Sequence, residues 1–76
     1  MNTEIREHFI HMLDYEKRTA YDTRDITRVR ECISFCEGII LTLIATDADY
    51  KLEAYAESIQ KDMYKLWNEL NNVRQF

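Results

Sequence analysis

Apolar residues recur at alternating four- and three-residue steps through the last part of the chain. The repeat consists of Leu52, Ala56, Ile59, Met63, Leu66, Leu70 and Val73. This spacing places all of these side chains on one side of an α-helix, so the unbroken repeat predicts a long amphipathic helix over residues 47–75. Thr46 is expected to cap this helix, with Asp49 at the capping-box position.

A second repeat of the same kind lies in the middle of the chain. Its members are Ile26, Val29, Ile33, Cys36, Ile40 and Leu43. It predicts a helix over residues 23–45, and Asp22 with Asp25 is suited to cap its start. The apolar face is widened by Cys32, Ile39 and Ile44. A helix with so wide an apolar face is expected to contact two neighbours, while Gly38 falls on its polar side.

The chain starts with a shorter helical pattern. Its apolar residues are Ile5, Phe9, Met12, Leu13 and Ala20. Their spacing predicts a helix over residues 3–19, with Thr3 as the N-cap and acidic residues near the positive end of the helix dipole. The junction after Thr19 contains neither glycine nor proline, so the expected break between the first two helices is a soft one.

Residues that favour turns are nearly absent, because the 76 residues include no proline and one glycine. Sandwiches, barrels and phosphate-binding loops need tight turns or close backbone approach, so this composition argues against them. We therefore predict an all-α fold, an antiparallel three-helix bundle forming one domain over residues 1–76. The longest uncharged stretch, residues 38–46, is about half as long as a membrane-spanning helix, and no membrane contact is expected.

The three expected helices differ in length, which leaves apolar residues to be covered. The longer third helix, folded back along the second, projects past the turn from about Asn68 onward. Phe35 and Leu41 also point away from the repeat of the middle helix. The predicted dimer or partner interface comprises Tyr64, Trp67, Leu70, Val73, Phe76, Phe35 and Leu41. We expect a homodimer; contact with a different protein and cover by the first helix stay open as alternatives.

The formal charge is −4, from 10 Lys and Arg against 14 Asp and Glu. Proteins that bind nucleic acid normally carry a basic excess, so direct binding is not expected. Two charge-based alternatives remain. In the first, an acidic face imitates the phosphates of DNA and occupies a DNA-binding partner. The residues of this face are Asp47, Asp49, Glu53, Glu57 and Asp62. In the second, a small DNA-binding regulator uses the face formed by Arg24, Arg28 and Arg30.

Candidate ligands for chemistry are few. Four of them follow one side of the first helix, namely Glu4, His8, His11 and Asp14. A set confined to one helix is a weak metal site, so surface histidines are the expectation. Cys32 and Cys36 are expected to be reduced core residues of a cytoplasmic protein. Because no phosphate-binding loop, dinucleotide motif or metal-finger spacing occurs, we expect no enzyme, no catalytic residue and no bound cofactor.

Surface recognition is the remaining interpretation. The chain has 5 tyrosines, 3 phenylalanines and 1 tryptophan, and tyrosine and tryptophan are preferred anchors of protein interfaces. We expect a non-enzymatic protein-interaction module, a regulator or inhibitor that binds another protein. In its shortness, acidity, helical pattern and lack of proline, the chain resembles small regulators and inhibitors encoded by phages and other mobile elements.

Overall fold

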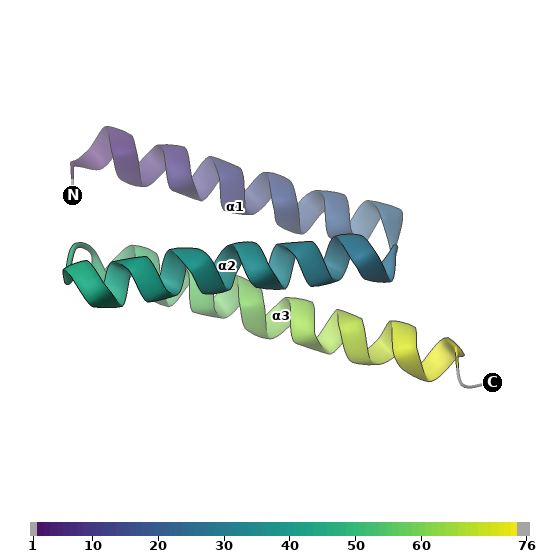
Figure 1. Ribbon diagram of the computed structural model, residues 1–76. Coiled ribbons are helices and arrows are strands. Elements are labelled where there is room, and N and C mark those ends of the chain that lie inside the picture. The colour runs from purple at the N-terminus through teal and green to yellow at the C-terminus, as the bar shows by residue number, and fades with distance from the viewer. Residues whose placement is uncertain (1, 75–76) are drawn as a thin grey trace.

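The computed structural model describes residues 2–74, and within them the chain forms three helices and no strand (Figure 1). Helix α1 covers Thr3–Thr23, α2 covers Ile26–Thr46 and α3 covers Tyr50–Arg74. Successive helices run in opposite directions, so the chain is an up-down-up bundle (Figure 1). Its principal extents are 46 × 21 × 14 Å. The predicted all-α antiparallel bundle is confirmed within the described chain.

Helix α1 starts at residue 3, as predicted, and ends four residues later than predicted. Asn2 is the N-cap, because its side chain accepts a hydrogen bond from the Ile5 amide at 2.8 Å. The predicted N-cap, Thr3, is instead the first helical residue. The helix continues to Thr23, where Arg24 takes a left-handed conformation with φ 50° and donates its amide to the Ala20 carbonyl. A left-handed residue stops a helix without glycine or proline, which corrects the expected end at residue 19.

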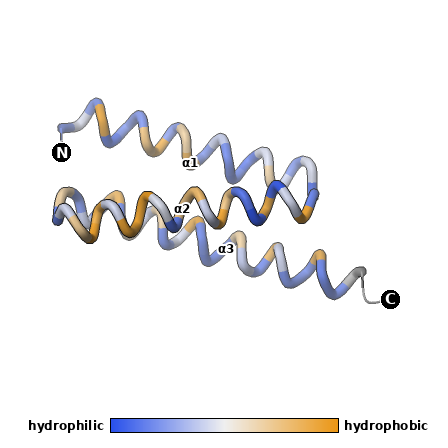
Figure 2. The backbone as a smooth tube through the Cα atoms, viewed as in Figure 1, coloured by the Kyte–Doolittle hydropathy of each residue, from blue (hydrophilic) through white to orange (hydrophobic). Residues whose placement is uncertain are grey.

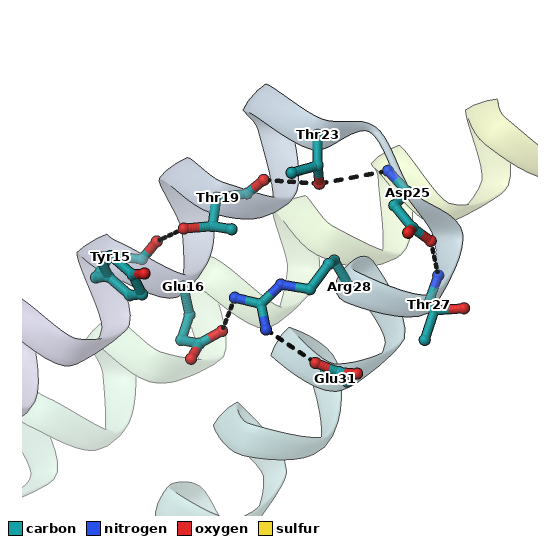
Figure 3. Close-up of polar contacts among 8 residues, drawn as sticks. All are labelled: Tyr15, Glu16, Thr19, Thr23, Asp25, Thr27, Arg28 and Glu31. Carbon is teal, nitrogen blue, oxygen red and sulfur yellow. Dashed lines mark hydrogen bonds and ion pairs between the residues drawn. The ribbon is translucent and has the colours of Figure 1, made fainter.

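Helix α2 begins directly after this corner. Asp25 is its N-cap and accepts from the Thr27 amide at 2.8 Å (Figure 3). Asp22 stays inside α1. The helix ends at Thr46, and Asp47 takes a second left-handed conformation with φ 50°. Two short connections with left-handed non-glycine residues therefore produce the bundle.

Helix α3 begins at Tyr50 and not at residue 47. Asp49 provides its cap, since one carboxylate oxygen accepts from the amides of Lys51 at 3.2 Å and Leu52 at 3.1 Å. Thr46, the expected cap, belongs to α2 and donates its hydroxyl to the Thr42 carbonyl. Asp49 therefore has the capping role that the sequence divided between two residues.

The core lies mainly between α2 and α3, which share the largest helix–helix interface. Its buried residues on α2 and α3 are Val29, Cys32, Cys36, Ile40, Leu43, Leu52, Ala56, Ile59, Met63 and Leu66. Helix α1 adds Leu13 and Ala20. Every buried position in the described part of α3, residues 50–72, belongs to the predicted heptad repeat. The hydrophobic colour is concentrated along α2 (Figure 2). No described helix is long and apolar enough to cross a membrane.

Polar contacts complete the attachment of α1. Arg6 pairs with Asp49 before α3, and Tyr55 of α3 donates its hydroxyl to Asp14. Near the α1–α2 corner, Glu16 accepts from Arg28 at 3.2 Å, and Arg28 also contacts Glu31 (Figure 3). Helix α1 thus joins the hairpin of α2 and α3 through a small apolar contact surrounded by charged pairs.

Candidate docking surface

An open apolar groove of about 450 Å³ runs between α1 and the C-terminal half of α2. It is lined by Phe9, Ser34, Phe35, Gly38, Ile39, Thr42, Leu43 and Thr46. None of these residues is charged, and only Phe9 comes from α1. The groove is therefore a feature of α2, with one aromatic side chain of α1 as its far wall.

Residues 38–46 of α2 are uncharged on every side of the helix. A helix without charged residues on any side is normally covered by other elements. Here Ile40 and Leu43 face the core, but Leu41 and Ile44 are each 56% exposed. The bundle therefore leaves part of an apolar helix open to solvent.

The exposed side of α2 carries a second four–three repeat of mostly small residues. It comprises Ser34, Gly38, Leu41 and Ala45, all of them exposed. Gly38 lies about 180° around the helix from the buried Val29, and a Cβ added at Gly38 would meet nothing within 4 Å. We call the groove residues together with Leu41 and Ala45 the α2 surface. Small residues at its centre allow another helix backbone to approach closely.

Apolar residues of α1 extend the same side of the molecule. Ile5 and Met12 are 47% and 36% exposed, and each lies one helical turn from the groove residue Phe9. The docking of α1 leaves these two side chains outside the core. They add exposed apolar surface to α1.

Charged groups lie near the two ends of α2. Arg30 is exposed, and within the described chain its guanidinium makes no ion pair. Asp47 is also exposed and follows the C-terminus of α2, whose last turn contains no basic residue. The negative end of the α2 dipole and the Asp47 carboxylate therefore lack a cationic neighbour on their own helix.

The interface predicted from the sequence is divided by the fold. Phe35 lines the groove and Leu41 is exposed beside it. Tyr64 is 50% exposed, but Trp67 and Leu70 are half-buried against the core. The side chain of Val73 and all of Phe76 lie outside the described residues. Helix α3 does project past the corner between α1 and α2 (Figure 1).

The predicted acidic face is not a single row. Asp49 is 8% exposed and pairs with Arg6, and Asp62 lies 3.5 Å from the Lys17 ammonium group. Glu57 is exposed, and five helical positions place Asp62 about 140° around α3 from it. Glu53 is half-buried and Asp47 is exposed. The arginine face is also divided, because Arg28 is engaged with Glu16 and Glu31 whereas Arg24 and Arg30 are exposed.

The possible metal ligands on α1 remain at the surface. His8 and His11 are exposed, as expected, and border a shallow hollow with Met12 and Tyr15. Asp14 accepts a hydrogen bond from Tyr55, which raises the pKa of Tyr55 to about 12. Across residues 2–74, no three His, Cys, Asp or Glu side chains gather closely enough to hold a metal ion.

The two cysteines are fully buried and free, as the sequence predicted. A hydrogen bond between the two sulfur groups lowers the pKa of Cys32 and raises that of Cys36, and burial raises the pKa of Cys36 further. Because both residues are 0% exposed, neither side chain is open to a substrate in this conformation.

Sequence reasoning missed the groove and its wall on α1. The uncharged stretch 38–46 was a usable signal. It is too short to span a membrane, yet it is uncharged on every side of the helix, and two neighbouring helices cannot cover every side. No local pattern in the sequence indicated that Asp49 would pair with Arg6. The chain matches no protein-family model, no curated protein and no solved structure.

Proposed function

We propose that this chain is a non-enzymatic protein-interaction module that acts by burying the α2 surface against another protein chain. The observation that carries the proposal is the uncharged segment 38–46, whose outer side is exposed. Contiguous exposed apolar patches mark interaction sites in proteins of this size. Covering a partner in this way is the action of a regulator or inhibitor, and the reduced cysteines suit the cytoplasm.

The shape of the α2 surface favours an α-helix as the bound element. Helix-in-groove recognition uses apolar side chains spaced three and four residues apart. The groove presents Phe9, Phe35 and Ile39 as apolar walls, while Gly38 and Ser34 leave room for a backbone. A second copy of this chain, which the sequence led us to expect as a homodimer partner, is one protein that carries such a helix.

A photocrosslinking experiment tests the proposal in cells that produce the protein. Benzoylphenylalanine replaces Leu41 in one variant and Tyr50 in a matched control; Tyr50 is 76% exposed and lies outside the α2 surface. We expect protein adducts from position 41 and few from position 50, with mass spectrometry of the adduct identifying the partner. Equal yields from both positions, or no adduct from position 41, would contradict the proposal.

A further inference from the structure

We propose that helix α1 is a releasable cover over Cys32 and Cys36, and that Cys32 is a thiol-modification site reached when α1 leaves the hairpin of α2 and α3. In the docked structure both cysteines are free and 0% exposed. This thiol site lies on the covered side of α2 and does not depend on the proposed function.

Helix α1 lies over the two thiols. Glu16 of α1 accepts from Arg28 of α2 (Figure 3). Because the two helices run in opposite directions (Figure 1), this contact places Leu13 level with residue 31, next to Cys32. Leu13 and both cysteines belong to one buried cluster. Release of α1 therefore uncovers the thiols without separating α2 from α3.

Helix α1 is attached less firmly than α2 and α3 are attached to each other. It contributes two buried side chains, Leu13 and Ala20, whereas α2 and the described part of α3 contribute five each. The ion pairs of the described chain that join it to the hairpin are Arg6–Asp49, Glu16–Arg28 and Lys17–Asp62. Their cationic side chains are between 31% and 37% exposed, and partly exposed pairs are weak and screened by salt. A helix held in this way opens more often than the whole chain unfolds.

The hydrogen bond between the two sulfur groups selects Cys32 as the reacting thiol. It lowers the pKa of Cys32 and raises that of Cys36, so Cys32 provides the nucleophilic thiolate. The co-reactant is a low-molecular-weight disulfide. The Cys32 thiolate attacks one of its sulfur atoms and forms a new S–S bond as the old S–S bond breaks. The other half leaves as a thiolate and takes up a proton, so the protein thiol is oxidised and the small disulfide is reduced.

A group attached to Cys32 would keep α1 from docking again. The docked site is fully buried beside Leu13, so the added atoms would overpack the core. Cys36 is four positions away on the same helix, where the geometry for a disulfide is poor, and the mixed disulfide therefore persists. Phe9 would leave with α1, and the groove would lose its far wall.

Alkylation of the reduced full chain by iodoacetamide, followed by mass spectrometry, measures the opening of α1. Leu13→Ala should speed labelling about 30-fold or more, because it removes methyl groups from the contact between α1 and the hairpin. Ile40→Val is the matched control, since Ile40 lies about 100° around α2 from the groove residue Ile39. It should lower resistance to urea and change the labelling rate by less than about twofold.

A second pair of variants leaves the core intact. Arg6 lies about 10 Å along α1 from Leu13, so it affects the thiols only if α1 opens as a unit. Arg6→Gln removes the pair with Asp49 and should speed labelling about fivefold. Arg30→Gln makes the same charge change at an exposed position of α2 and should leave the rate unchanged. Circular dichroism checks that each variant keeps its helices.

Hydroxyethyl disulfide tests the modification itself. We expect one adduct, retained in Cys36→Ser and lost in Cys32→Ser. Hydrogen exchange of the adduct should show lost protection across α1, with α2 and α3 still protected.

Three results would overturn the proposal. They are labelling that Ile40→Val speeds as much as Leu13→Ala does, an adduct that forms on Cys36 in place of Cys32, and an adduct whose α1 keeps its native protection. Photocrosslinking from position 41 is independent of all three.

Discussion

Arg6 near the start of α1 and Asp49 at the start of α3 form an ion pair, with 2.6 Å between Nε and Oδ2. The two residues are 43 positions apart in the chain. Asp49 is nearly buried, and it caps α3 through the amides of Lys51 and Leu52 at the same time. One carboxylate therefore joins the free end of α1 to the turn between α2 and α3.

This arrangement predicts a loss of stability in acid. The Arg6 guanidinium and the two amides lower the pKa of Asp49 below its usual value of 3.8. A lowered pKa stabilises the folded state while the carboxylate is charged, and this contribution disappears as the pH falls below about 4 towards the lowered pKa. Urea unfolding at a series of pH values should show Asp49→Asn less stable than the native chain near neutrality, with the gap closing in acid. Asp47→Asn is the control at an exposed carboxylate; a gap of constant size for Asp49→Asn would contradict the prediction.

For Tyr55 we predict a loss of stability in alkali instead of in acid. The hydrogen bond from its hydroxyl to Asp14 raises the pKa of Tyr55 to about 12. Its contribution to stability is complete below the normal tyrosine pKa of about 10 and is lost as the pH rises towards 12. Tyr55→Phe should remove the last phase of an ultraviolet tyrosine titration and lower the free energy of unfolding near neutrality by about 1 kcal/mol. Tyr50→Phe, at an exposed hydroxyl, should preserve that phase; its loss in this control would refute the assignment.

Leu13 and Leu41 should respond differently to truncation. Leu13 is 0% exposed, so Leu13→Ala removes buried methyl groups and should lower the free energy of unfolding by about 2–5 kcal/mol. Leu41 is 56% exposed, and Leu41→Ala should change the monomer by less than about 0.5 kcal/mol. Urea unfolding at low protein concentration measures both values. Equal losses would mean that Leu41 is covered within the single chain.

Glycine at position 38 is expected to reduce the stability of the monomer. Gly38→Ala should raise the free energy of unfolding by about 0.5–1 kcal/mol, because alanine favours the helix and its Cβ would meet nothing within 4 Å. The reverse change at exposed Ala45, Ala45→Gly, should lower it by a similar amount. Thermal unfolding followed by circular dichroism provides the comparison. A destabilising Gly38→Ala would show that another group already occupies this space in the monomer.

Much of the fold was predictable because heptad periodicity is a local property of the sequence. The repeat from Leu52 to Leu66 is buried as predicted. Together with the apolar patterns of the other two segments, it led to the prediction of three helices, which the structure has. The helix ends were less predictable. Arg24 and Asp47 stop their helices in left-handed conformations, and an arginine or aspartate at such a position has a much weaker signal than glycine.

The candidate site was predictable only in part. The sequence placed Leu41 away from the core, and its exposure confirms that placement. Phe35 became a wall of the groove, and Trp67 with Leu70 became half-buried, because these outcomes depend on where the neighbouring helices lie. The pairing of Asp49 with Arg6 also joins distant segments, so no local pattern could indicate it.

The sequence by itself determined three amphipathic helices with almost no turn residues, because helical periodicity and the lack of proline and glycine act within each segment. Only the tertiary structure decided which side of each helix is covered. Helix α2 has apolar residues on all sides of its C-terminal half, and two neighbours cannot surround a helix completely. The positions of α1 and α3 cover Ile40 and Leu43 and leave Leu41 open to solvent, which is where we expect the chain to meet its partner.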